Sequence, residues 1–334
     1  MVRVAINGFG RIGRMIFRAG FNDPSIEWVA FNDISVPEEL AYLLKFDTVA
    51  HRFKGDVSFD DRHVIVNEKK IPVFAERDPS KLPWKDMNVD VVIECTGFFT
   101  KHDQSKLHLD AGAKRVLISA PSHDPDITIV KGVNEHLYDA SKHFIVSMAS
   151  CTTNSLAPMV KVLNDNFGIV HGFMSTVHAY TADQRILDAP STHHKDLRRS
   201  RAAGANTIPT ETGAAKAIGQ VVPELNGKLD GMAFRVPVTV GSITDLSVVL
   251  KKSVTVEEVN HLFHEVANYH MKGILEYSDE PLVSSDIIGN AHSCIFDAKS
   301  TKVIDGTLVK VIGWYDNEWG YSNRMVDVIK IIGV

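Results

Sequence analysis

The first half of the chain alternates between short β-type and helical patterns of apolar residues. Residues 2–6 are apolar and β-branched at alternate positions, which predicts a buried strand, and residues 12–19 are apolar at helical spacing. The runs 27–34 and 90–97 predict further buried strands, and 108–122 predicts a helix, a glycine stop and a strand. This alternation is typical of an α/β domain with a parallel sheet.

The second half of the chain has a different pattern. Long β-rich runs cover 168–181, 227–252 and 294–316, whereas 212–225 and 255–271 have helical periodicity. We therefore expect an α+β arrangement, in which a mostly antiparallel sheet carries helices on one face.

The two patterns predict two domains, and 334 residues with 44% hydrophobic content are enough for two cores. We expect an α/β domain over 1–150 and an α+β domain, with a mostly antiparallel sheet, over 151–319. The apolar C-terminal segment 320–334 is expected to be a helix that packs back on the first domain.

Charge and cysteine content exclude several classes of protein. A net charge of -5 argues against nucleic acid as the main partner and against a basic membrane-binding patch. Three widely spaced cysteines predict neither a disulfide framework nor a metal site. No apolar run approaches the ~20 residues of a membrane span, and the first residues lack a signal-peptide pattern. We expect a cytoplasmic protein.

A glycine motif follows the first predicted strand. Gly8, Gly10 and Gly13 have the spacing G-x-G-x-x-G at the start of the first helix. The first glycine permits a tight turn, the second lets a pyrophosphate approach the backbone, and the third allows close packing of helix on strand. The helix N-terminus adds amide donors and a favourable dipole for phosphate. We therefore expect the domain over 1–150 to be an α/β Rossmann dinucleotide-binding domain.

The next predicted strand ends near Asp33, about 20 residues past the last glycine. A carboxylate there accepts hydrogen bonds from the adenosine ribose and repels a 2′-phosphate, which favours NAD over NADP. Ser119 follows another predicted strand and is expected to line the same crevice. Arg77 is either an adenine contact or a solvated loop residue.

Cys151 raises a chemical question, because it lies among small polar residues between an apolar run, 144–146, and a predicted helix. A helix start favours the thiolate, so we expect a lowered thiol pKa. His178, at the end of a β-rich run, is a candidate base. The alternative is a buried thiol and an unrelated strand histidine. For Cys95 and Cys294 we expect buried core positions within apolar strands.

Seven segments carry a resemblance to a known family. They are INGFGRIGR, ASCTTN, HAYT, KDLRR, TGAAKA, FRVP and WYDNEWGYSNR. In this order they resemble phosphorylating glyceraldehyde-3-phosphate dehydrogenase along essentially the whole chain. The resemblance implies oxidation of D-glyceraldehyde 3-phosphate with NAD and inorganic phosphate, through a thiohemiacetal and a thioester on Cys151. It also implies a homotetramer.

The resemblance identifies 151–319 as the catalytic domain and assigns roles to individual residues, with Cys151 as nucleophile and His178 as its base. The implied NAD contacts include Arg11, Ile12, Asp33, Ser119 and Asn317. The implied substrate and phosphate contacts are Ser150, Thr152, Thr181, Arg198, Arg199, Thr212, Gly213 and Arg235. Of the two adjacent arginines, Arg199 is the first choice and Arg198 the second.

The chain departs from the usual family pattern at several positions. Ser155 replaces a frequent second cysteine, and Glu211 places a negative charge next to the implied phosphate pair, from which we expect it to point away. A longer loop around 189–195 leaves its local geometry and its effect on cofactor preference open, although Pro190 favours NAD.

Two other functions remain as alternatives. Erythrose-4-phosphate dehydrogenase shares the cysteine, the histidine and the cofactor fold, but Tyr315 and the segment 119–122 are more similar to the glyceraldehyde enzyme. The other alternative is a non-catalytic protein that binds NAD or RNA.

Overall fold

A computed structural model describes residues 1–190 and 196–333. The described chain divides into two compact units. Unit 1 comprises residues 1–129, 136–149 and 322–334, and unit 2 comprises 130–135 and 150–321. Among the described residues, no helix has the length and apolar character needed to cross a bilayer.

Unit 1 is built on a largely parallel sheet with the strand order β3-β4-β5-β2-β1-β6-β7-β9-β8. Its parallel strands are β1 (Val2–Asn7), β2 (Ile26–Asn32), β6 (Val91–Glu94), β7 (Arg115–Ile118), β8 (Ile127–Thr128) and β9 (Ile145–Ser147). Strands β2 and β6 both pair with β1, so the strand order reverses there, as in a doubly wound fold. The predicted Rossmann fold is confirmed.

An antiparallel extension that we did not anticipate lies beside β2. It consists of β3 (Val57–Asp60), β4 (His63–Val66) and β5 (Lys69–Phe74), and β5 pairs parallel to β2. The predicted strand 90–97 ends early, at Glu94, so Cys95 follows the strand and is partly exposed rather than a core residue of it.

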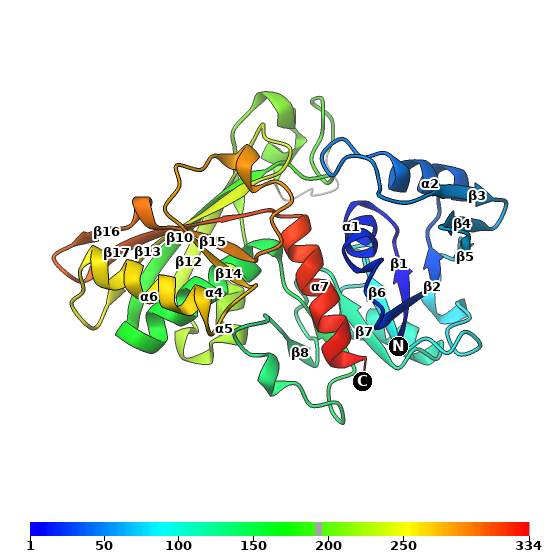
Figure 1. The fold of residues 1–334 in the computed structure, drawn as a ribbon, viewed down its shortest axis with the longest axis horizontal. Helices are drawn as coiled ribbons and strands as arrows, with labels where there is room; N and C mark the ends of the chain where they lie inside the picture. The colour runs from blue at the N-terminus through cyan, green and yellow to red at the C-terminus, as the bar shows by residue number, and fades with distance from the viewer. Residues whose placement is uncertain (191–195, 334) are drawn as a thin grey trace. The chain divides into compact units, whose positions relative to one another are not determined.

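The helices of unit 1 are α1 (Arg11–Gly20), α2 (Pro37–Lys45) and α3 (His102–Asp110). The last helix of the chain, α7 (Trp319–Ile332), is red in Figure 1, and its residues from 322 onward belong to unit 1. Lys330 Nζ donates to Asp23 at 3.1 Å, and Tyr138 Oη donates to the Ile332 carbonyl at 3.5 Å. These contacts fix the end of α7 within unit 1.

Unit 2 contains a mostly antiparallel sheet with the order β11-β12-β10-β13-β17-β15-β14, with β16 paired to β17. Its strands are β10 (Ile169–Ala179), β11 (Ile208–Glu211), β12 (Leu229–Val236), β13 (Ser242–Leu250), β14 (Leu275–Ser278), β15 (Cys294–Asp297), β16 (Lys302–Ile304) and β17 (Leu308–Tyr315). The pairs β10–β12 and β14–β15 are parallel, and the others are antiparallel. This confirms the predicted α+β arrangement.

Three helices pack with the apolar face of this sheet in one core. They are α4 (Cys151–Phe167), α5 (Ala214–Val221) and α6 (Val256–Asn268). The periodic apolar positions of the helices and alternate residues of β13 supply the core, because a strand presents every second side chain to one face. Cys294 is fully buried there, as expected.

Short 3₁₀ helices occur in the connections between these elements. They span Pro79–Lys81, Glu135–Leu137, Leu197–Ser200, Ala203–Ala205, Pro223–Leu225, Ser284–Ile287 and Ala298–Ser300.

The stacked pair Phe263 and Phe296, whose ring centroids are 3.9 Å apart, is fully buried in the unit 2 core. We expect Phe296→Ala to lower the free energy of unfolding by about 3–5 kcal/mol, because it leaves a cavity between α6 and β15. Denaturant unfolding followed by tryptophan fluorescence measures this. The control is Tyr269→Ala, at a residue that is 76% exposed; equal losses in the two variants contradict the prediction.

Candidate active site

Cys151 is the first residue of α4, in unit 2. Ser150 is the N-cap, and its Oγ accepts a hydrogen bond from Thr153 N at 3.0 Å. Ala149, just before the cap, has a φ of 53°, a conformation that costs free energy for a non-glycine residue. The chain therefore keeps a strained residue where it delivers the sulfur to the helix start.

His178 faces this sulfur from strand β10. Its Nε2 lies 3.4 Å from Cys151 Sγ, and its Nδ1 lies 2.7 Å from the Ala179 carbonyl oxygen. The carbonyl can only accept and so favours a proton on Nδ1, whereas Arg235 Nη1, 2.7 Å from the same nitrogen, can only donate and favours a proton on Nε2. General-base action on the thiol requires the first of these tautomers, in which Nε2 is the acceptor.

Arg235 reaches the same histidine because β10 and β12 are paired in parallel with His178 opposite Arg235. Its Nη1 is 2.7 Å from His178 Nδ1, and it also donates to the Ala179 carbonyl at 3.2 Å. Burial, together with the positive charge of Arg235, lowers the pKa of His178 to about 3. The imidazole is therefore neutral at physiological pH.

Burial raises the pKa of the Cys151 thiol, although the Arg235 charge and hydrogen bonds from Thr152 act in the opposite direction. The expectation of a lowered thiol pKa is therefore wrong for this structure. The helix start supplies the favourable donors that we foresaw, but the loss of solvation exceeds their effect. A neutral thiol beside a neutral imidazole still suits proton transfer from sulfur to Nε2 during attack.

Tyr315 also contributes to the site. The sequence analysis named it only as a residue that is more similar to the glyceraldehyde enzyme than to the erythrose enzyme. Its hydroxyl lies 2.9 Å from both Thr152 Oγ1 and Thr176 Oγ1. Its ring is edge-on to the His178 ring, and the two ring centroids are 5.9 Å apart. Burial raises the pKa of this phenol. Tyr315 thus joins β17, β10 and the first turn of α4 through one hydroxyl.

The side of the site next to Arg235 is suited to an anion. Arg235 Nη1 donates to Thr181 Oγ1 at 3.3 Å, so these two implied phosphate contacts lie together. Arg235 Nε is buried and has no hydrogen-bond partner among the described residues. An unsatisfied buried guanidinium nitrogen fits a site that takes a phosphate group.

The adjacent arginines differ in their surroundings. Arg199 is mostly buried and donates from Nη1 to Asp183 Oδ2 at 2.5 Å and from Nε to Thr210 Oγ1 at 3.2 Å. Arg198 is exposed and donates to the Pro209 carbonyl at 3.4 Å.

The sequence analysis missed Asp183. This carboxylate accepts from both Thr181 and Arg199 and so links two implied anion contacts. The HAYT segment, two residues upstream of Asp183, was the only nearby signal.

The other implied substrate residues lie at helix starts. Thr212 and Gly213 come directly before α5, where Ala214 N donates to Thr212 Oγ1 at 3.2 Å. Glu211 is exposed. Ser155 is buried one turn after Cys151 and accepts from Thr244 Oγ1 at 3.3 Å.

The glycine motif in unit 1 has the geometry expected of a dinucleotide cradle. Gly8 has a φ of 93°, and a Cβ on Gly13 would lie 2.3 Å from the Gly8 carbonyl oxygen. A Cβ on Gly10 would meet nothing within 4 Å, so the backbone is open to a ligand there. Gly10 is also the N-cap of α1 and places no side chain over the first turn. These observations fit a bound pyrophosphate.

Asp33 immediately follows β2 and is held in place by backbone donors. Its Oδ2 accepts from Phe9 N at 2.8 Å and its Oδ1 from Ser35 N at 2.9 Å. The remaining lone pairs of this partly exposed carboxylate fit a ribose diol.

The other implied cofactor residues have varied surroundings. Ser119 Oγ donates to the Glu94 carbonyl at 3.0 Å, and Arg11 is ion-paired with Asp47. Ile12 is partly buried and Arg77 is exposed. Asn317 belongs to unit 2, where its Oδ1 accepts from Gly241 N and Ser242 Oγ. Most of the predicted loop 189–195 lies outside the described residues.

Comparison with known proteins shows similarity over the whole chain. Residues 2–102 match the family profile described as glyceraldehyde 3-phosphate dehydrogenase, NAD binding domain, and residues 150–317 match its C-terminal domain. The chain is 55% identical to glyceraldehyde-3-phosphate dehydrogenase 2 of Streptomyces avermitilis over 333 residues, covering 99% of this chain and 98% of that protein. It is also 56% identical over 331 residues to glyceraldehyde-3-phosphate dehydrogenase 1 of Bacillus subtilis and to glyceraldehyde-3-phosphate dehydrogenase of Geobacillus stearothermophilus. Each of these alignments covers 99% of this chain and 98% of the relative.

The three thiols are expected to differ in reactivity. Burial raises the pKa values of Cys95 and Cys294 to about 12, whereas Arg235 and helix amides oppose that effect at Cys151. Iodoacetamide at pH 8 should therefore modify Cys151 first in the native protein and all three cysteines after denaturation. Peptide mass spectrometry over a time course measures this, and labelling of Cys95 at the rate of Cys151 contradicts it.

Proposed function

Because the chain belongs to the glyceraldehyde-3-phosphate dehydrogenase family, we propose that it converts D-glyceraldehyde 3-phosphate, NAD⁺ and inorganic phosphate into 1,3-bisphosphoglycerate and NADH. The observation that carries the proposal is the 3.4 Å approach of His178 Nε2 to Cys151 Sγ, with Arg235 beside them. A nucleophile, a base and an anion-binding group thus lie together in unit 2.

Cys151 begins the reaction by attacking the aldehyde carbon. A carbon–sulfur bond forms, the thiol proton passes to His178 Nε2, and protonation of the former carbonyl oxygen gives a thiohemiacetal. We propose that Thr181 and Arg235 hold the substrate's own phosphate group and so keep the aldehyde near the sulfur; the hydrogen bond between these two residues supports this.

His178 then acts as a base toward the thiohemiacetal hydroxyl. Removal of this proton supports loss of hydride from the same carbon, which is oxidised to a thioester. Bound NAD⁺ supplies the two-electron acceptor for that hydride. The cradle at Gly8–Gly13 and the carboxylate of Asp33 would hold the dinucleotide.

Inorganic phosphate completes the cycle. One of its oxygens attacks the thioester carbonyl, the carbon–sulfur bond breaks, and Cys151 leaves and regains a proton as the acyl phosphate forms. We propose that Ser150, Thr152, Thr212, Gly213 and Arg199 bind this phosphate. In support, Ser150 and Gly213 are N-caps of α4 and α5, where backbone amides favour anions.

We also propose that the protein acts in the cytoplasm and as a homotetramer. Three free cysteines fit a reducing compartment. The face of β10 and β12 that turns away from the core exposes Phe173, Val177 and Met232 at 71%, 38% and 39%. Neighbouring outward apolar side chains of this kind are suited to pairing with another copy.

The oligomer proposal predicts that Phe173→Asp dissociates the assembly, because the introduced charge would have to be buried between copies. Sedimentation velocity should show a smaller species than the wild type. Tyr269→Asp, at an exposed position elsewhere in unit 2, is the control. A monomeric wild type, or an unchanged Phe173→Asp variant, contradicts the proposal.

Activity should depend steeply on the sulfur and the base. We expect Cys151→Ser to lower the rate of NADH formation from glyceraldehyde 3-phosphate by about 10³-fold or more, because a hydroxyl is a far weaker nucleophile. His178→Asn should lower it by about 10²–10⁴-fold. His171→Asn, at an exposed position on the same strand, is the control.

The initial-rate assay uses NAD or NADP, with and without phosphate, and compares glyceraldehyde 3-phosphate with erythrose 4-phosphate as the aldehyde. Faster turnover of erythrose 4-phosphate would assign the protein to the alternative dehydrogenase. RNA binding without NADH formation would favour the non-catalytic alternative. Turnover that does not require phosphate would contradict the proposed attack of phosphate on the thioester.

A further inference from the structure

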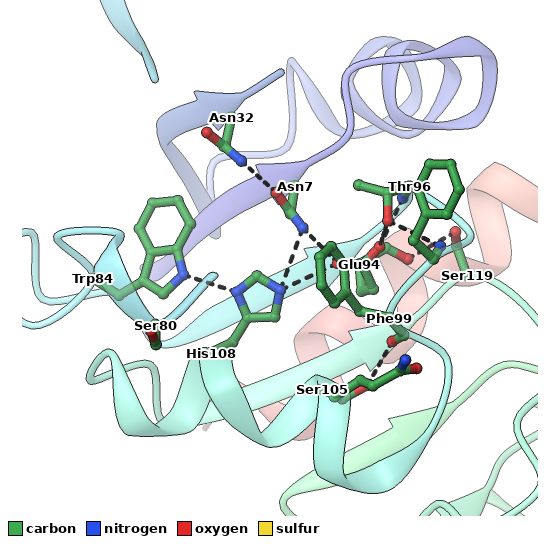
Figure 2. A network of polar contacts seen from close by, with 12 residues as sticks. Asn7, Asn32, Ser80, Trp84, Glu94, Thr96, Phe99, Ser105, His108 and Ser119 are labelled. Carbon is green, nitrogen blue, oxygen red and sulfur yellow. Dashed lines mark hydrogen bonds and ion pairs between the residues drawn. The ribbon is translucent and has the colours of Figure 1, made fainter. Parts of the chain in front are cut away.

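A buried polar network occupies unit 1, and the mechanism above does not use it (Figure 2). Its centre is Glu94, the last residue of β6, which is fully buried. Figure 2 shows Asn7, Thr96 and His108 around this carboxylate, with Trp84 behind the histidine. A buried carboxylate without a catalytic partner has to be explained by what its hydrogen bonds hold in place.

Glu94 accepts hydrogen bonds from two directions. Its Oε2 lies 2.5 Å from Asn7 Nδ2 and 3.1 Å from His108 Nε2. Its Oε1 accepts from Thr96 N at 2.7 Å and also from the Thr96 hydroxyl. These four donors suit an ionised carboxylate and would conflict with an amide in either orientation.

Trp84 selects the form of His108 that this arrangement needs. The indole Nε1–H can only donate, and it lies 3.0 Å from His108 Nδ1, which must therefore be the acceptor. The ring proton is then on Nε2 and points to Glu94. His108 is a neutral bridge between the indole and the carboxylate.

The network links the ends of neighbouring strands. Asn7 ends β1 and its Oδ1 accepts from Nδ2 of Asn32, which ends β2, at 2.7 Å. On the other side, the backbone nitrogen and the hydroxyl of Ser119, just after β7, both donate to the Glu94 carbonyl. Asn32 also exchanges hydrogen bonds with the backbone of Glu76.

These positions are next to the proposed NAD contacts in the chain. Asn7 precedes Gly8, Asn32 precedes Asp33, and Glu76 precedes Arg77, whereas Ser119 is itself a proposed contact. Glu94 is thus connected to the ends of β1 and β2 through its carboxylate and Asn7, and to the end of β7 through its backbone carbonyl. Fixing these ends before binding removes an ordering cost that would otherwise weaken affinity.

We infer that Glu94, held by His108, is a positioning residue that sets the affinity for NAD by fixing the four strand ends of the dinucleotide cradle. The inference rests on the proposed function, because it takes NAD as the ligand. It concerns cofactor binding and not the chemistry at Cys151, since the network lies wholly in unit 1.

The test compares two isosteric changes, one at the last residue of β6 and one at the residue just before its first. Glu94→Gln sets an amide N–H against donors and should raise the dissociation constant for NAD about tenfold to a hundredfold in isothermal titration calorimetry. Asp90→Asn is the matched control, because Asp90 accepts from Arg3 N and Lys114 at the other end of the strand. It should leave the dissociation constant within about twofold while destabilising the fold.

The kinetic constants should distinguish cofactor affinity from catalysis in the same variants. At saturating NAD, kcat of Glu94→Gln should stay within about threefold of the wild type, whereas KM for NAD rises in parallel with the dissociation constant. Affinity changes that are equal in Glu94→Gln and Asp90→Asn overturn the inference, because they mark a purely structural role. A wild type that does not bind NAD overturns the proposed function instead.

Variants at two neighbours keep the test decisive if Glu94→Gln does not fold. Thr96→Val removes one donor and should raise the dissociation constant about threefold to tenfold. His108→Leu should weaken binding, whereas His108→Gln, which can accept from Trp84 and donate to Glu94, should restore it. Unchanged affinity in Thr96→Val and His108→Leu overturns the inference.

Discussion

In unit 2, the parallel pairing of β10 with β12 places His178 directly opposite Arg235. Cys151, the first residue of α4, approaches the other ring nitrogen of that imidazole, Nε2. This register determines the site's chemistry. A shift of one residue would turn His178 to the other side of the sheet, because successive strand residues face opposite ways. Cys151 would then have no base, and the anion site would lose its contact with the nucleophile.

The closeness of an arginine to the base has two consequences. Its charge adds to the effect of burial, the larger cause, in lowering the pKa of His178 below that of a free imidazole, so that the base is uncharged before the reaction. It also provides a buried guanidinium nitrogen, Arg235 Nε, that can donate to an anion, and the substrate of the proposed reaction carries a phosphate group. Electrostatics that disfavour an imidazolium therefore favour the phosphorylated aldehyde.

Both units place polar side chains at strand ends and hold them with buried hydrogen bonds. In unit 2, the Tyr315 hydroxyl joins Thr152 to Thr176. In unit 1, Glu94 joins Asn7 to Thr96. The Tyr315 hydroxyl and the Glu94 carboxylate are satisfied by these neighbours, which makes both arrangements rigid as well as tolerable in an apolar core.

The sequence by itself determined the type of each unit and the position of its main residues. Local patterns were sufficient, because the glycine spacing, the strand periodicity and the cap at Ser150 act over a few neighbouring residues. Those patterns did not reveal the antiparallel strands over 57–74, whose polar and apolar residues form no long period.

Only the tertiary structure decided which distant side chains meet. The approach of Asp183 to Arg199, and of Trp84 and His108 to Glu94, depends on how strands and helices pack, which the sequence analysis did not predict. The same holds for the Cys151 thiol, where the sequence correctly supplied the helix start but burial reversed the expected pKa shift. Burial is a property of the whole fold, so no local pattern contains it.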